Sequence, residues 1–413
     1  MRQVFLDHQS STPVLPEVFD AMKPFFTEQF GAPASLHHHG LLAREAVAAA
    51  RAQAAAFINA SSPEEIIFTS GGTESANLAV KGAAYANRRR GNHIVVSATE
   101  HISVLNSVEF LEAQGFTCTR VKVDAEGLVN PQEIRAALTD QTILICVHHV
   151  NHELGTIEPV QEIGRIAAER SIAFFVDAVA TGGWLPIDVQ AMGATLLSVS
   201  PHRFYGPKGV GILYRKRSAR LTPLQQGGSQ EDGRRAGTEN VPAIVGAGVA
   251  AEIASRELPE RMAHTAKLQR RLWDGLQQRI PHLKLNGPAP GPLRISTSLN
   301  LSVEFVEGEG LVLLLDMKGI AAASGPACIS KALKVSHVLE AIGLDHALAQ
   351  GNVMLSLGRA NTAEEVDYVL EMFEPIVAKL RGMSPLWDEF QRGAIKSVIG
   401  PGEGKRNPAG QIS

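Results

Sequence analysis

The hydrophobic residues of the chain fall into short continuous runs separated by longer helical patterns. Four runs of strand length, at residues 93–97, 142–148, 171–177 and 195–199, are almost uninterrupted, as is typical of buried strands. Alanine-rich residues 42–57 favour a helix, and residues 241–280 show a long helical pattern with a charged face. This mixture of buried strands and helices predicts an α/β protein.

The pattern changes after Pro281, where short apolar runs at 283–285 and 297–303 alternate with helical segments. We therefore expect two domains. A large domain is predicted over residues 15–262, and a smaller α/β domain is predicted from residues 1–14 together with 263–395. The tail at 396–413 is rich in glycine, proline and charge, and is expected to be disordered.

Composition narrows the class of protein. The chain has 413 residues, 45% of them hydrophobic, which is enough for two domains and a large core. A formal net charge of −3 gives no reason to expect nucleic acid or an anionic membrane as a partner. No apolar run has the length of a membrane span, the first residues lack a signal-peptide pattern, and three scattered cysteines fit a reducing compartment. We expect a cytoplasmic protein.

The turn that follows the run at 195–199 carries candidate chemistry. Ser200 and His202 stand at a strand end, where α/β proteins usually bind ligands, and both side chains can contact a phosphate. The next residue is Arg203. A guanidinium stays protonated and cannot form an imine with an aldehyde cofactor, so covalent catalysis through this residue is excluded.

Other strand ends carry polar residues as well. A glycine turn with Gly72 and Thr73 leads from a strand into a helix, where free N–H groups can bind an anion. Such turns are common, so this one alone is weak evidence. Asp177 ends a strand and can pair with a protonated pyridine nitrogen. Three consecutive histidines at 37–39 favour a substrate-access loop or a solvated turn over a metal site.

Residues 200–211 read Ser-x-His-x-x-Tyr-Gly-Pro-Lys-Gly-Val-Gly. This segment resembles the cofactor-lysine segment of the NifS/IscS cysteine desulfurases, pyridoxal-phosphate (PLP) enzymes of the class V aminotransferase group. The resemblance covers nearly the whole chain. It implies a fold like that of type I PLP-dependent transferases, with a mainly parallel sheet flanked by helices in the large domain. In that family the residue after the histidine is the lysine that carries PLP, and this chain has Arg203 there.

The resemblance also implies roles for residues that match the family. It assigns the cofactor phosphate to Gly72, Thr73, Ser200, His202 and Thr238. In the family the threonine at the last position reaches the phosphate from the partner subunit, which implies a homodimer.

Around the cofactor ring, the resemblance places His101 against the ring face and Asp177 at the ring nitrogen, and it gives Arg359 the substrate carboxylate. Two further departures fall beside the reactive part of the ring. His152 replaces an asparagine of the family's Val-Asn-Asn-Glu pattern, and Ala180 replaces a glutamine that bonds the ring oxygen.

Cys328 lies in a Gly-Pro-Ala-Cys-Ile-Ser segment that resembles the desulfurases' mobile loop, whose cysteine takes sulfur as a persulfide. Its spacing to the next helical segment is similar to the subgroup that feeds iron–sulfur assembly. An exposed thiol there can be a nucleophile or a metal ligand. Residues 383–390 resemble the terminal segment of IscS proteins, near where the scaffold protein IscU docks.

Three hypotheses follow. In the first, the protein binds PLP weakly or not at all and uses Cys328 to carry sulfur or to ligate an iron–sulfur cluster with an IscU-like scaffold. In the second, PLP and cysteine combine in solution and bind without a covalent link, and His101 or His152 replaces the lysine as the base. In the third, the chain is a pseudoenzyme that only binds a partner.

Overall fold

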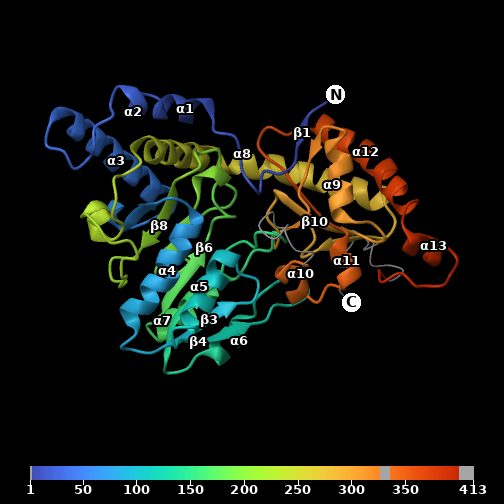
Figure 1. Cartoon of the computed structure of the whole chain (residues 1–413), viewed down its shortest axis with the longest axis horizontal. Coiled ribbons are helices and arrows are strands. Elements are labelled where there is room, and N and C mark those ends of the chain that lie inside the picture. The colour runs from blue at the N-terminus through green and yellow to red at the C-terminus, as the bar shows by residue number, and fades with distance from the viewer. Residues whose placement is uncertain (1, 326–334, 400–413) are drawn as a thin grey trace.

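The computed structural model describes residues 2–325 and 335–399. One body is built on a seven-stranded sheet, which is drawn from blue to green in Figure 1. Its strand order is β2 (Ile66–Thr69), β8 (Gly211–Arg215), β7 (Leu196–Val199), β6 (Ala173–Asp177), β5 (Thr142–Cys146), β3 (His93–Ser97) and β4 (Thr117–Val121). Strands β7 to β4 run parallel, whereas β8 is antiparallel to both of its neighbours. The prediction of a mainly parallel sheet is confirmed.

Both faces of this sheet are covered, because successive side chains of a strand point to opposite sides. Phe175 of β6 packs with α4 (Gly72–Asn87) and α5 (Ile102–Glu112). Phe174 packs on the opposite side with α3 (His38–Phe57), α6 (Pro131–Ala137), α7 (Val160–Glu169) and part of α8 (Val241–Arg279). Burial on both faces explains the continuous apolar runs in the sequence.

A second body surrounds an antiparallel sheet of order β12 (Asn352–Ser356), β10 (Ser298–Val303) and β9 (Leu283–Asn286). Its core also contains residues of α9 (Gly308–Asp316), α12 (Ala363–Arg381) and α8. The chain start contributes as well, since β1 (Val4–Phe5) pairs in parallel with β11 (Ile320–Ala321). The second body therefore combines segments from both ends of the chain.

Helix α8 connects the two bodies (Figure 1). It has 39 residues and begins at a cap in which the Asn240 side chain accepts a hydrogen bond from the backbone N–H of Ala243. Ala250 packs in the core of the seven-stranded sheet, and Leu272 packs in the core of the antiparallel sheet. One helix thus contributes to both cores.

Shorter helices complete the described chain: α1 (Pro16–Met22), α2 (Pro24–Thr27), α10 (His337–Ala341), α11 (His346–Gln350) and α13 (Pro385–Gln391). Three 3-10 turns are η1 (Pro63–Glu65), η2 (Pro201–Arg203) and η3 (Gln230–Gly233). The expectation of a loop at 37–39 is wrong. His38 and His39 begin α3, and His37 caps that helix by accepting a hydrogen bond from the backbone N–H of Gly40 at 3.3 Å.

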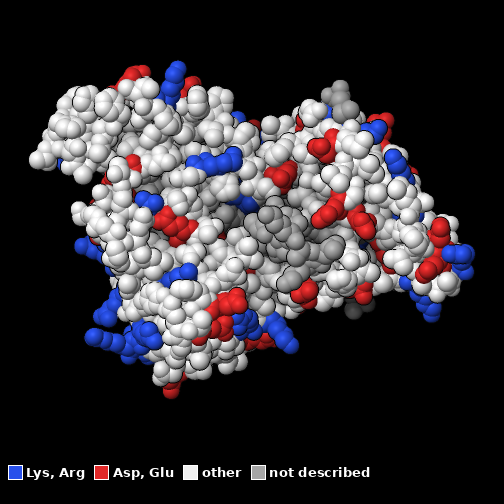
Figure 2. Space-filling model, viewed as in Figure 1, with Lys and Arg blue, Asp and Glu red and all other residues white. Residues whose placement is uncertain are grey.

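The surface gives two further observations. Figure 2 shows acidic and basic side chains interspersed over the visible face. Within the described residues, no helix combines the length and the apolar character that crossing a membrane would require. The described part of the expected tail contacts the second body, because Ser397 and Val398 donate hydrogen bonds to Glu304; the rest of that tail, residues 400–413, lies outside the described residues.

Candidate functional site

A cavity of about 320 Å³ opens at the carboxyl ends of the parallel strands. The carboxyl ends of such strands are the usual ligand site of open α/β sheets. Most of the predicted site residues meet in its lining: Gly72, Thr73, His101, His152, Asp177, Ser200, His202 and Arg203. Thr238 and Arg359 do not belong to this lining, and Cys328 lies outside the described residues.

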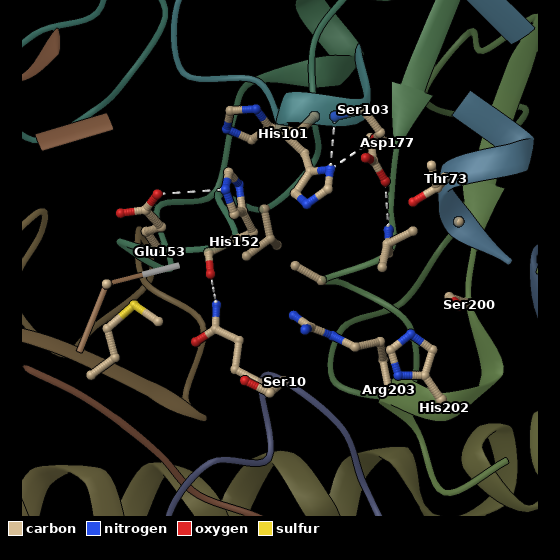
Figure 3. A pocket seen from close by; sticks show the side chains of 18 residues that line it. Ser10, Thr73, His101, Ser103, His152, Glu153, Asp177, Ser200, His202 and Arg203 are labelled. Atoms are coloured by element: carbon tan, nitrogen blue, oxygen red, sulfur yellow. Dashed lines mark hydrogen bonds and ion pairs between the residues drawn. The ribbon is translucent and has the colours of Figure 1, made fainter. Parts of the chain in front are cut away.

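One side of the cavity is formed by the first turn of α4 and by η2. Gly72 and Thr73 begin α4, where helix N–H groups lack intrahelical partners. A Cβ atom at Gly72 would come within 2.9 Å of Val179 Cγ2, so glycine allows this turn to pack closely. Ser200 and His202 follow β7 and face the same space, as Figure 3 shows. We call Gly72, Thr73, Ser200 and His202 the cradle.

Two polar atoms of the cradle have no partner within the described chain. Ser200 Oγ and His202 Nδ1 are buried and make no hydrogen bond there. Burial, together with the positive charges of Arg203 and Lys208, lowers the pKa of His202 to about 4, so its ring is neutral at pH 7. Buried polar groups without partners are costly, and this pair is suited to an oxygen-rich ligand.

Asp177 ends β6 and its carboxylate is held in place from within the sheet. Its Oδ1 accepts hydrogen bonds from Ser198 Oγ at 2.9 Å and from the backbone N–H of Val179 at 3.0 Å. Within the described residues, Oδ2 receives no hydrogen bond. The carboxylate is therefore oriented, with one oxygen left for a ligand.

His101 caps α5 and its ring is held in one tautomer. The backbone N–H of Ser103 donates to His101 Nδ1 at 3.2 Å, so the proton of the neutral ring lies on Nε2. Burial lowers the pKa of His101, and the nearby Arg203 and His337 add to this effect although Asp177 opposes it. At pH 7 the cavity therefore faces a neutral imidazole.

His152 stands opposite the cradle, beside His101. Their ring centroids are 4.9 Å apart and the rings meet edge to face. Burial lowers the pKa of His152 well below its ordinary value, and the neighbouring His101 contributes in the same direction. Its Nε2 lies 3.6 Å from Glu153 Oε1, and its backbone oxygen accepts a hydrogen bond from the Gln9 side chain.

Glu153 lines the cavity, and the sequence analysis missed it. This carboxylate is buried, and it accepts hydrogen bonds from Ser336 Oγ at 2.8 and 2.6 Å. Burial raises the pKa of Glu153 to about 7. Its position directly after His152, in the turn that follows β5, was the signal that could have identified it.

A second missed group is a buried charged network behind the histidines. His148 Nδ1 lies 2.7 Å from Glu100 Oε1, and its Nε2 lies 3.5 Å from Glu158 Oε1. Burial opposes protonation, but the charges of Glu100 and Glu158 outweigh it and raise the pKa of His148 to about 10. The opposite holds for His149, because burial and the charge of His148 lower its pKa to about 4.

Arg203 reaches into the cavity from η2 (Figure 3). Its backbone is fixed, since its N–H donates to Ser200 O at 3.1 Å and its carbonyl accepts from Trp184 Nε1 at 3.1 Å. Burial lowers the pKa of Arg203 to about 10, against the effect of Asp177 and Asp7, so the side chain is cationic at pH 7. Lys208, the nearest lysine in sequence, is exposed.

The two predicted residues outside the cavity are placed as follows. Arg359 Nη1 donates to Glu257 Oε2 at 3.0 Å, and its backbone N–H donates to Tyr205 Oη at 2.7 Å. Thr238 is exposed, in the segment that leads into α8. In this chain taken by itself, neither side chain completes the cavity wall.

Residues 4–369 match the family model described as Aminotransferase class-V, which spans most of the chain. The chain belongs to the class V aminotransferase family. Within it, the chain is similar to a cysteine desulfurase IscS of Clostridium botulinum, with 46% identity over 95% of this chain and 98% of the relative. It is also similar to a cysteine desulfurase IscS of Methanosarcina thermophila, with 49% identity over 93% of this chain and 94% of the relative.

Solved structures support the same relationship within the class V family. A protein named NIFS-LIKE PROTEIN superposes with a TM-score of 0.86 at 36% identity, and the match covers 92% of this chain and all of that one. A structure named SspA in complex with cysteine superposes with a TM-score of 0.77 at 35% identity, over 87% of this chain and 100% of that one. The resemblance to the NifS/IscS cysteine desulfurases is confirmed.

Proposed function

We propose that the chain is a cysteine desulfurase-like protein of sulfur transfer, whose cavity binds PLP without a covalent link from position 203 and whose Cys328 carries the sulfur. The relatives named cysteine desulfurase IscS support sulfur transfer, and the relative solved in complex with cysteine supports cysteine as the sulfur source. Arg203 is the reason for the non-covalent link, because a guanidinium cannot take the place of the lysine amine.

The observation that carries this proposal is the unsatisfied cradle. Ser200 Oγ is fully buried and has no partner in the described chain, and His202 Nδ1 beside it has none either. The N-terminus of α4 adds free N–H groups and a positive dipole end. A phosphate group would satisfy all of these donors together, so the residues present fit PLP at its phosphate end.

The ring end fits as well. Asp177 keeps one free carboxylate oxygen that can pair with a protonated pyridine nitrogen, and His101 presents a neutral ring to the same space. PLP, when bound, supplies an electron sink that weakens the bonds at the α-carbon of an amino acid. The protein's own task at this end is to orient the ring and to keep its nitrogen protonated.

Proton transfer requires a base in place of the missing amine. His152 is the best placed, because its neutral ring lines the cavity beside His101 and its Nε2 lies 3.6 Å from Glu153. We propose that His152 Nε2 accepts a proton at the reacting centre and that Glu153 stabilises the resulting imidazolium. A base held this way contributes about 10²- to 10⁴-fold to a rate.

The role proposed for Cys328, which lies outside the described residues, is supported by the described residues on either side of it in sequence. Gly325 lines the cavity, and Ser336 is bonded to the cavity residue Glu153. In the proposed function the Cys328 thiolate attacks the sulfur of substrate cysteine and becomes a persulfide. The C–S bond of the substrate breaks, its electron pair passes to the carbon skeleton, and that skeleton takes up a proton and leaves as alanine. An IscU-like scaffold is the proposed acceptor of the sulfur. The proposed unit is a homodimer, in which the exposed Thr238 of each chain completes the cradle of the other.

The proposal is tested with purified protein freed of PLP. We expect one molecule of added PLP to bind per chain. Because no imine links it to the protein, borohydride reduction should not fix it, and gel filtration under denaturing conditions should remove it. Sulfide release from cysteine should then depend on PLP and disappear in Cys328→Ser. Cluster absorbance that needs Cys328 but no PLP would replace this function by iron–sulfur ligation. If the protein does not bind PLP, release sulfide or hold an iron–sulfur cluster, the remaining role is that of a pseudoenzyme that only binds a partner.

A further inference from the structure

Arg203 has no counter-ion in direct contact. Within residues 2–325 and 335–399, its guanidinium makes no hydrogen bond and no ion pair, although its backbone is bonded on both sides. Figure 3 shows the side chain extended from the cradle side toward the middle of the cavity. Arg203 is half-buried, and a partly desolvated charge is stabilised by pairing, so this cation is suited to an anion from outside the protein.

The two carboxylates that attract Arg203 form no ion pair with its guanidinium within the described residues. Asp177 and Asp7 act on it at a distance, but Asp177 Oδ1 accepts from Ser198 and Val179, and Asp7 Oδ1 accepts from Ser10 Oγ at 2.7 Å. Burial raises the pKa of Asp7, while the hydrogen bonds from Ser10 and the charge of Arg203 act in the opposite direction.

A polar side chain that shares both cavities with Arg203 is already hydrogen-bonded. Gln9 lines the cavity with Arg203, but it donates to the backbone oxygen of His152 and accepts from Ser298 Oγ at 2.9 Å. Lys208, exposed at the outer edge of the cradle, is the other cation on this side. The guanidinium of Arg203, inside the cavity, is therefore available to bind a ligand.

Space for a ligand group exists beside the guanidinium. Ala180 lines the main cavity and also a small neighbouring cavity that contains Arg203, Trp184 and Gln9. A longer side chain at position 180 would extend into this space. The neighbouring cavity is only about 10 Å³, so the room for a ligand group lies in the main cavity of about 320 Å³, which Ala180 and Arg203 both line. This space can take a planar anion such as a carboxylate, which a guanidinium can bind through two parallel hydrogen bonds.

We infer that Arg203 is the carboxylate-binding residue of this cavity, and that the cavity selects ligands with a phosphate at one end and an amino-acid carboxylate at the other. This inference rests on the proposed function and deepens it, because it names the ligand class. The cradle takes the phosphate and Arg203 takes the carboxylate. Arg359 does not compete for this role, since it is paired with Glu257 outside the cavity lining.

The test uses two stable compounds that differ by one carboxylate, N-(5′-phosphopyridoxyl)-L-alanine and N-(5′-phosphopyridoxyl)ethylamine. Binding of each to the PLP-free protein is measured by isothermal titration calorimetry, so no turnover is needed. A charge-assisted pair predicts that the wild-type protein prefers the alanine compound by about 10- to 100-fold. In Arg203→Met this preference falls to about one, whereas in Arg359→Met it remains.

Binding of the ethylamine compound serves as the control for a folded cavity, because it uses the cradle but not the guanidinium. A preference that survives in Arg203→Met, or that disappears in Arg359→Met instead, overturns the inference while leaving PLP binding intact. If neither compound binds the wild-type protein, the proposed function fails, and that result is distinct from the loss of selectivity alone. If Arg203→Met does not bind the ethylamine compound, its cavity is not intact, and Arg203→Gln is used instead. The ratio of its affinities for the alanine and ethylamine compounds is then the result that decides.

Discussion

The two sides of the cavity differ in how their polar groups are satisfied. In the cradle, Ser200 Oγ and His202 Nδ1 have no partner in the described chain. On the opposite side the carboxylates face a cation or a donor of the protein: Glu100 and Glu158 flank His148, and Glu153 is bonded to Ser336. Some atoms there, among them Glu100 Oε2 and His148 Nε2, also make no hydrogen bond within the described residues, but their charges are opposed by neighbouring charges of the protein. The first side is arranged for a ligand, whereas the second supplies its own countercharges.

The two sides also differ in how closely their residues match the pattern of the desulfurases. The cradle agrees with the family pattern at Gly72, Thr73, Ser200 and His202, while His152 and Ala180 replace family residues on the reactive side. Arg203 projects between the two sides. The comparison teaches that the unpaired polar atoms of the cradle do not require a lysine at position 203, because different side chains supply the two features.

The largest expected effect is a gain of covalent attachment in Arg203→Lys. A lysine amine at this position can bond to the aldehyde of PLP, whereas the guanidinium cannot. After borohydride reduction and denaturation, mass spectrometry should show one PLP per chain in the variant and none in the wild-type protein. Lys208→Arg is the matched control and should change neither result. A covalent adduct on Lys208 of the wild-type protein would contradict the comparison.

The sequence predicted the cradle because its residues follow directly from strand ends. Buried runs place β6 and β7 side by side, and Asp177, Ser200 and His202 come immediately after them. Parallel strands bring such ends to one edge of the sheet, so their convergence follows from the topology. Local pattern identifies Ser200, His202 and Asp177, whereas Gly72 and Thr73 were assigned through the resemblance to the desulfurases.

The opposite side could not be predicted in the same way. Glu100 and His148 meet because β3 and β5 are neighbours in the sheet, with a register shift at His93, and Glu153 meets Ser336 across 183 positions of the chain. The ion pair of Arg359 with Glu257 likewise depends on how α8 lies against the second body. These contacts are set by tertiary packing and leave no periodic or compositional signal.

The second prediction concerns the pH dependence of the free energy of unfolding, on which the adjacent His148 and His149 have opposite effects. The pKa of His148 is raised to about 10 in the folded protein, so its stabilising effect is complete below about pH 6.5 and is lost as the pH rises toward 10. The pKa of His149 is lowered to about 4, so its neutral state favours folding above about pH 6.5 and stability is lost as the pH falls toward 4.

Urea unfolding of the PLP-free protein between pH 4 and pH 10 measures both effects. His148→Gln should lose about 3–5 kcal/mol at pH 7, because it leaves two buried carboxylates without their cation, and should flatten the decline above neutral pH. His149→Gln should instead flatten the decline at acid pH. Equal pH profiles for the two variants would show that this side of the cavity does not supply its own countercharge.

The third prediction tests whether the polar atoms of the cradle that have no partner form hydrogen bonds to PLP. Ser200→Ala should weaken PLP binding by about 10-fold, and the double variant with His202→Ala by about 100-fold, because each removes a hydrogen bond to a charged group. The stability of the PLP-free protein should not fall in Ser200→Ala, since the change deletes a buried hydroxyl that has no partner. Calorimetric PLP titration and urea unfolding measure these quantities.

Ser10→Ala is the matched control for the cradle. Ser10 lines the same cavity, but its hydroxyl already donates to Asp7 Oδ1 at 2.7 Å. We expect this variant to keep its PLP affinity within about twofold, because no bonding capacity is left for the ligand. A loss in Ser10→Ala as large as that in Ser200→Ala would remove the distinction between engaged and open hydroxyls.

The smallest expected effect belongs to Arg359, which lies outside both sides of the cavity. Its side chain is 33% exposed and that of Glu257 is 24% exposed, so their ion pair at 3.0 Å is well hydrated. A double-mutant cycle with Arg359→Met and Glu257→Gln should give a coupling free energy below about 1 kcal/mol in urea unfolding. The affinity of Arg359→Met for phosphopyridoxyl-alanine should equal that of the wild-type protein. A marked loss of that affinity would mean that Arg359 leaves Glu257 to enter the occupied cavity, and the carboxylate would then belong to the family's arginine after all.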